Sequence, residues 1–228
     1  MQANYTQRLR LTFSKTGPTR FIGHLDLART LERALNRARI PVAYTQGFNQ
    51  RPRMQLAAAL PLGFTSECEM ADIWLTETME PAQVKPQLMA KMAPGITIHQ
   101  VEDVDLKAPT LQTLTRESVY EVTLLDEMVG RQPSATAVLQ QKITTLLAAD
   151  TLVRERGYGK KQKKYDLRPL IYDLRLVSDS GPVVLEMRLA LAEGKNGRPD
   201  EVLEELSLDP LAARVHRTAI VLADPVTE

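Results

Sequence analysis

Strand-like and helix-like periods follow one another in the same order in both halves of this 228-residue chain. Apolar residues that alternate with polar ones predict strands, and apolar residues three or four apart predict helices. The first half contains predicted strands at 8–14, 42–45, 54–60, 69–76 and 96–101, and helices at 23–38 and 80–92. The second contains strands at 118–125, 152–156, 167–177, 183–191 and 214–222, and helices at 134–148 and 200–206. Each half approximates a β-α-β-β-α-β order, which predicts an α+β protein of two tandem ferredoxin-like units with antiparallel sheets.

A polar segment without clear periodicity, residues 103–115, separates the two halves and contains Pro109. We therefore expect an N-terminal domain over residues 1–107 and a C-terminal domain over residues 118–228. Each is long enough to bury a core of its own.

Composition excludes several classes of protein. The single cysteine, Cys68, rules out an internal disulfide and an iron–sulfur cluster ligated by this chain alone. The three histidines are far apart in sequence, so no metal site is expected, and no cofactor is expected in this chain. No segment resembles a signal peptide or a membrane span, which favours a cytoplasmic protein.

Charge is distributed unevenly along the chain. Residues 1–53 hold ten Arg and Lys but only two acids, Asp26 and Glu32, whereas residues 54–153 hold six basic and thirteen acidic residues. Seven further basic residues lie within Arg154–Arg168. Such local concentrations of one charge create fields that a near-neutral total does not cancel, and they favour a polyanionic partner such as RNA. The alternative is a solvated, dipolar surface.

The predicted helix at 23–38 is strongly amphipathic. Leu27, Leu31, Ala34, Leu35 and Ala38 share one face, and Arg29, Arg33 and Arg37 share the opposite one. Like charges at this spacing repel each other, and an anionic partner would relieve the repulsion. The three arginines are therefore candidate nucleic-acid contacts, although Arg side chains also cover apolar surface on ordinary solvated helices.

Two loops offer further candidate contacts. Phe48, Asn49, Arg51 and Arg53 combine stacking, hydrogen bonding and charge in the loop 46–53, as RNA-binding loops do. Phe48 could equally anchor this loop in the core. The second loop is lysine-rich, and its candidates are Arg156, Lys160, Lys161, Lys163, Lys164 and Arg168. The alternative there is a solvated surface loop, and Asp166 with Arg168 would fix its exit through an ion pair or a turn.

Signals for catalysis are few. His24 could act as a general base with Asp26 orienting it, because histidine titrates near neutrality. Packing of His24 at the edge of the helix is the simpler interpretation. Cys68 lies between Glu67 and Glu69, whose charges would raise the pKa of its thiol, so it is not expected to be a nucleophile.

Several short motifs are spread over nearly the whole chain: Phe21-Ile-Gly-His-Leu-Asp-Leu27, Gln46-Gly-Phe-Asn49, Pro52-Arg53, Ala59-Leu-Pro-Leu-Gly63, Tyr165-Asp-Leu-Arg-Pro169 and Arg198-Pro199. In these motifs the chain resembles a bacterial domain-of-unknown-function family that is linked to radical S-adenosylmethionine (radical SAM) enzymes. Gln50-Arg51 departs from the Pro followed by His or Arg that is usual in the family. Members are encoded beside, or fused to, cobalamin-binding-type radical SAM proteins. The resemblance thus implies a radical SAM partner that carries S-adenosylmethionine, an iron–sulfur cluster and cobalamin.

Three hypotheses follow. The first is a non-catalytic accessory protein that binds RNA and presents it to the radical SAM partner. The second is a metal-independent RNA-processing enzyme that uses His24. The third is a protein–protein adaptor whose basic face docks on the partner enzyme.

Overall fold

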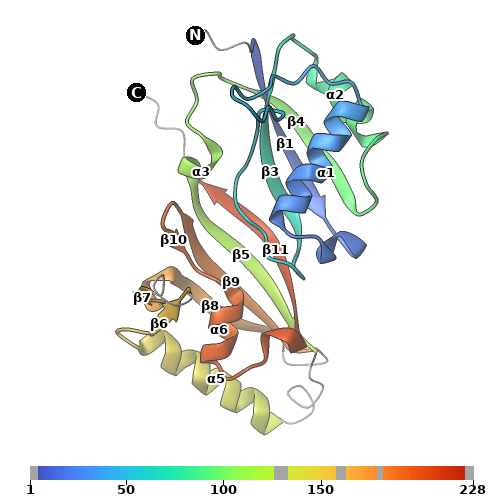
Figure 1. The fold of residues 1–228 in the computed structure, drawn as a ribbon. Helices are drawn as coiled ribbons and strands as arrows, with labels where there is room; N and C mark the ends of the chain where they lie inside the picture. The colour runs from blue at the N-terminus through green and yellow to red at the C-terminus, as the bar shows by residue number, and fades with distance from the viewer. Residues whose placement is uncertain (1–4, 126–132, 158–162, 179–181, 224–228) are drawn as a thin grey trace. The chain divides into compact units, whose positions relative to one another are not determined.

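The computed structural model describes residues 5–125, 133–157, 163–178 and 182–223. It divides into two compact units (Figure 1). The first holds the chain up to Thr115 and the returning Ala223, and the second holds Arg116–Leu222. Both combine helices with mostly antiparallel strands, so the α+β class is confirmed. Among the described residues, none of the helices is long and apolar enough to cross a membrane.

The sheet of the first unit has four strands in the order β2-β3-β1-β4, each antiparallel to its neighbour. Its strands are β1 (Gln7–Lys15), β2 (Met54–Leu56), β3 (Thr65–Leu75) and β4 (Ile96–Val104). The predicted strand at 42–45 is wrong in part. Only isolated bridges form there, from Val42 to Leu75 and from Tyr44 to Pro52, because this segment leaves the sheet edge after Val42.

Two helices, α1 (His24–Arg37) and α2 (Pro81–Met89), cover one face of this sheet (Figure 1). The apolar face predicted for α1 is confirmed, because Leu27, Leu31, Ala34, Leu35 and Ala38 are all buried. They pack with Leu9, Leu11 and Phe13, which alternate along β1 as a strand requires. The short 3-10 helix η1 (Gly17–Phe21) precedes α1, and α3 (Leu111–Leu114) ends the unit.

The other face of β1 and β3 holds a buried ionic cluster. Asp72 is fully buried and accepts hydrogen bonds from Arg8 at 2.5 and 3.0 Å and from Arg10 at 2.9 and 3.1 Å. Arg8 also bonds the carbonyls of Ala108 and Pro109. Arg8, Arg10 and the fully buried Lys15 therefore contribute little to the basic surface that the charge count of residues 1–53 predicted.

The second unit has four longer strands in the order β8-β9-β5-β11, and the short β10 pairs with the far end of β9. The strands are β5 (Thr115–Leu124), β8 (Ile171–Ser178), β9 (Val184–Ala192), β10 (Lys195–Asn196) and β11 (Ala213–Leu222). The helices are α5 (Pro133–Ala148) and α6 (Pro199–Glu205), with 3-10 turns η3 (Arg168–Leu170) and η4 (Pro210–Ala212).

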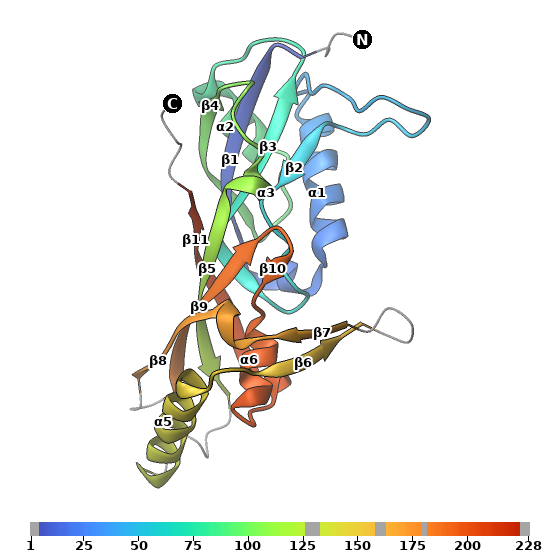
Figure 2. The same cartoon turned by 90° about the vertical axis from the view of Figure 1, so that its left-hand side faces the viewer.

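The predicted strand at 152–156 does not join the main sheet of this unit. It forms β6 (Val153–Arg156), which pairs only with β7 (Lys163–Asp166) in a separate two-stranded sheet (Figure 2). The reason is its composition, since three of its four residues are charged and cannot lie in an apolar core. The lysine-rich segment is thus in part a hairpin, and residues 158–162 lie outside the described residues.

Candidate nucleic-acid interface

The arginine stripe, Arg29, Arg33 and Arg37, lies on the face of α1 opposite the core, and all three side chains are exposed. Arg29 forms an ion pair with Asp26 at 3.2 Å, in which both side chains are more than half exposed. Arg37 donates to the carbonyl oxygen of Lys91 at 2.8 Å, which fixes it without neutralising it. The described residues place no carboxylate within 4.0 Å of the Arg33 guanidinium. The stripe therefore keeps a net positive charge in contact with solvent.

Residues 43–53, which we call the arm, run out and back between α1 and β2 (Figure 2). Its two legs are joined by backbone hydrogen bonds from Thr45 to Arg51 and from Arg53 to Ala43. Gly47 adopts a φ of +127° at the turn, a region that glycine enters without strain. Phe48 stands at the tip with a relative exposure of 104%. The alternative that Phe48 anchors this loop in the core is therefore wrong.

The arm is attached to the face of α1 that carries the stripe. The phenol of Tyr44 donates a 3.0 Å hydrogen bond to Oδ1 of Asn36. Asn36 follows Arg33 by three residues and therefore shares its side of the helix. The sequence analysis missed Tyr44 and Asn36, and no local pattern could have found them because the contact depends on the path of the arm.

The three other candidates on the arm differ in their surroundings. Asn49 and Arg51 are exposed. Arg53 lies at the base, where its guanidinium is 4.6 Å from the ring centroid of Tyr5 and 5.0 Å from that of Trp74. These cation–π contacts hold Arg53 in place but leave its side chain exposed.

His24 and Asp26 begin α1, but Asp26 bonds to Arg29 rather than to His24. Nδ1 of His24 is buried and has no hydrogen-bond partner among the described residues. Burial lowers the pKa of His24, and the charge of Glu69 opposes this effect only in part. The imidazole is therefore neutral at pH 7.

In the second unit, Arg156 is fixed by one carboxylate and one aromatic ring. Its guanidinium donates to both oxygens of Glu201 at 2.7 and 2.9 Å and lies 4.5 Å from the ring centroid of Tyr165. Burial alone would lower the pKa of Arg156, but the hydrogen bonds and charge of Glu201 raise it. Sequence analysis missed Glu201, which is 45 residues away along the chain.

The remaining basic candidates of this unit fall into three groups. Lys163 and Lys164 are both exposed, and Lys164 pairs with Glu155 at 3.5 Å. Arg168 donates to the carbonyls of Leu147 and Ile171, so its guanidinium supports the fold. Lys160 and Lys161 lie outside the described residues. The predicted turn at the loop exit is confirmed, because Oδ1 of Asp166 accepts from the backbone N–H of Arg168 at 3.0 Å.

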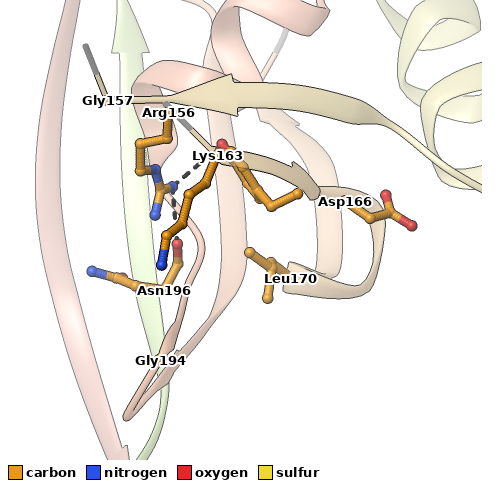
Figure 3. A pocket seen from close by; sticks show the side chains of 8 residues that line it. Arg156, Gly157, Lys163, Asp166, Leu170, Gly194 and Asn196 are labelled. Atoms are coloured by element: carbon orange, nitrogen blue, oxygen red, sulfur yellow. Dashed lines mark hydrogen bonds between the residues drawn. The ribbon is translucent and has the colours of Figure 1, made fainter. Parts of the chain in front are cut away.

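A pocket of about 470 Å³ lies beside the β6–β7 hairpin (Figure 3). It is lined by Arg156, Gly157, Lys163, Tyr165, Asp166, Leu170, Gly194 and Asn196. In the part of the chain that the structure describes, no three His, Cys, Asp or Glu side chains are grouped as metal ligands would be.

A comparison with curated proteins gives no match. A family model described as "Uncharacterized protein conserved in bacteria (DUF2344)" matches residues 8–199. This range includes the stripe, the arm and every residue that lines the pocket. The match spans most of the chain, which therefore belongs to the DUF2344 family of proteins conserved in bacteria.

Proposed function

We propose that this protein is a cytoplasmic accessory subunit that binds RNA and presents it to a separate radical SAM enzyme. The stripe and the arm of the first unit would form the principal RNA contact. RNA binding is inferred from the exposed Phe48, and the enzyme partner is inferred from the family resemblance.

The fully exposed Phe48 is the observation that carries the RNA part. A fully exposed aromatic ring lacks the stabilisation of about 1.5–3 kcal/mol that its burial in the core would give. Such a ring at the tip of an arm therefore favours contact with a binding partner. Unpaired bases stack on such rings, and nearby Asn49 and Arg51 can hydrogen-bond the base and contact its phosphate. The Tyr44–Asn36 hydrogen bond ties the base of the arm to the helix whose arginines would follow the RNA backbone.

The enzyme part rests on the resemblance carried by the motifs around His24, Asn49, Gly63 and Pro169. Cys68 alone cannot hold the three-Cys cluster of a radical SAM enzyme, so the cluster, S-adenosylmethionine and cobalamin would belong to the partner. The protein would then contribute recognition of the substrate, and the partner would contribute the reaction.

We further propose that both units are ferredoxin-like. The strand orders β2-β3-β1-β4 and β8-β9-β5-β11 support this, because each follows from a β-α-β-β-α-β chain with its first and third strands in the middle. The β6–β7 hairpin would be an insertion between the first helix and the second strand of the second unit.

The decisive experiment compares two triple variants that change the net charge equally. Arg29→Glu/Arg33→Glu/Arg37→Glu reverses the stripe, whereas Lys85→Glu/Lys107→Glu/Arg214→Glu reverses exposed basic residues elsewhere. Fluorescence anisotropy with single-stranded RNA at several salt concentrations measures affinity. Loss of three phosphate contacts should lower the slope of log K against log salt by about 2, at about 0.7 per contact. The control should stay near the wild-type slope.

Equal losses in the two triple variants would show that RNA senses only total charge and would contradict a specific interface. Unchanged binding of the stripe variant to RNA, combined with lost co-purification of the radical SAM protein, would favour the adaptor hypothesis. Cleavage of RNA without metal that disappears in His24→Ala would favour the enzyme hypothesis.

A further inference from the structure

We propose that the pocket beside the β6–β7 hairpin binds a single nucleotide, with the phosphate at Lys163 and the base against Leu170. The inference deepens the proposed RNA binding, on which it rests for the ligand class, by adding a second and separate site. The nucleotide could be free or one unit of an RNA chain, and the experiment below distinguishes the two.

The pocket has the size and the polarity that a nucleotide requires. Its volume of about 470 Å³ falls within the range of about 300–1,000 Å³ that small-molecule sites occupy. Figure 3 shows the side chains of Arg156, Lys163 and Asn196 gathered at one end. Leu170 faces them, and Asp166 lies beyond it. One end is therefore cationic and the other is not.

The cationic end contains an unbalanced charge. Arg156 and Lys163 are directly opposite each other in the antiparallel β6–β7 pair, where like charges repel. Glu201 balances Arg156, but the described residues place no carboxylate within 4.0 Å of Lys163. An anion in the pocket would pair with Lys163 and remove the repulsion.

The wall at this end is ordered by contacts within the protein. Nη2 of Arg156 contacts Glu201 at 2.7 Å, and it contacts the phenol oxygen of Tyr165 and the backbone carbonyl of Asn196 at 3.3 Å each. These contacts tie the hairpin to β10 and α6 and hold the backbone of Asn196 beside the hairpin. A wall that is already ordered loses less conformational entropy on binding.

The opposite end favours a base rather than a second phosphate. Leu170 offers an apolar surface, and the chain packs tightly behind it, because a Cβ on Gly197 would lie 2.8 Å from the carbonyl oxygen of Leu170. The Asp166 carboxylate does not enter this end, because strand alternation places it on the opposite side of β7 from Lys163, where its Oδ1 accepts from the backbone N–H groups of Leu152 and Arg168. A nucleoside monophosphate satisfies both ends.

Titration calorimetry of the full chain with AMP, UMP, adenosine and inorganic phosphate tests this assignment. Lys163→Glu should weaken nucleotide binding by about tenfold or more, because it removes a charged hydrogen bond. Lys164→Glu is the matched control, since Lys164 is the adjacent residue and points to the opposite side of the hairpin. It should change the affinity less than about twofold. Adenosine and phosphate should each bind more weakly than AMP.

Two results would overturn the inference: no nucleotide binding at millimolar concentration, or equal losses in Lys163→Glu and Lys164→Glu. RNA anisotropy on the same variants then identifies the source. If Lys163→Glu weakens both AMP and RNA, the nucleotide is part of the RNA chain, and if it weakens AMP alone, the ligand is a free nucleotide. RNA binding that persists without nucleotide binding would reject the pocket but keep the proposed function, and the reverse would reject the proposed function alone.

Discussion

The arginine stripe of α1 and the β6–β7 hairpin are both rich in basic residues, but their side chains have different surroundings. On α1 the arginines face solvent, and the one carboxylate that contacts them among the described residues, Asp26, is itself exposed. Along β6 the arginines face α6, where Arg154 pairs with Glu204 and Glu205, and Arg156 pairs with Glu201. A count of basic residues therefore describes an exposed cationic surface in the first case and an internal support in the second.

The difference arises from how each element meets its neighbours. The charged face of α1 points away from the sheet because the apolar face needs the core. The β6–β7 hairpin has no apolar face, so it is held to α6 by ion pairs instead. Cations that hold a hairpin cannot also bind phosphate without releasing their carboxylates. Lys163 is the cation of the hairpin that combines a place in the pocket with freedom from a carboxylate among the described residues.

Among the substitutions that test this difference, replacement of Glu201 should have the largest effect, on the free energy of unfolding. Glu201→Ala leaves Arg156 partly buried without its partner and should destabilise the chain by about 2–3 kcal/mol, less than a fully buried pair because Arg156 is 38% exposed. Urea unfolding followed by circular dichroism measures the change. Glu155→Ala, which removes the exposed partner of Lys164, is the control and should cost less than about 1 kcal/mol. Equal costs would show that the hairpin cations are as free as those of α1.

Truncation of the aromatic ring at the tip of the arm tests the first unit, where we expect a loss of RNA affinity without a loss of stability. Phe48→Ala should weaken binding to single-stranded RNA by about 1–3 kcal/mol, the value of one stacked base, and leave stability unchanged because the ring packs on nothing. Tyr172→Ala removes an exposed aromatic ring of the second unit and should leave RNA affinity unchanged. A stability loss in Phe48→Ala without a change in RNA affinity would contradict the proposed role of the arm.

The smallest effect concerns pH, at the start of the helix that carries the stripe. Burial lowers the pKa of His24 in the folded state, so the unfolded chain takes up its proton more readily. Stability should therefore fall as pH drops below about 6.5, the unperturbed value, and stop falling below the folded-state pKa. His24→Gln should make this loss smaller, because glutamine does not titrate. A pH profile of His24→Gln identical to that of the wild type would contradict the desolvation of His24.

Locally determined features could be predicted from the sequence. The helix at 23–38 and its buried residues were predictable because the spacing of Leu27, Leu31 and Leu35 is a property of the helix alone. Most strands of the two main sheets were also found, although β3 begins at Thr65 rather than near Glu69 and the two-residue β10 was missed.

Features that depend on distant residues could not be predicted. Asp72 forms ion pairs with Arg8 and Arg10 from more than 60 residues away, and Glu201 pairs with Arg156 from 45 residues away. Nothing near these arginines in sequence distinguishes them from Arg33. Phe48 was ambiguous for another reason, since a glycine turn beside an aromatic residue fits either a buried anchor or an exposed tip.

Lys163 and Lys164 are adjacent and chemically identical, yet the alternation of a strand sends them to opposite sides of the hairpin. Their mutational tolerance should therefore differ in a full substitution scan. Position 164 should accept Gln, Thr or Ser readily, because it only supports an exposed ion pair with Glu155. Position 163 should retain a cation, with Arg as its best replacement. A nucleotide site at Lys163 would thus place two different selective pressures on neighbouring codons for the same amino acid.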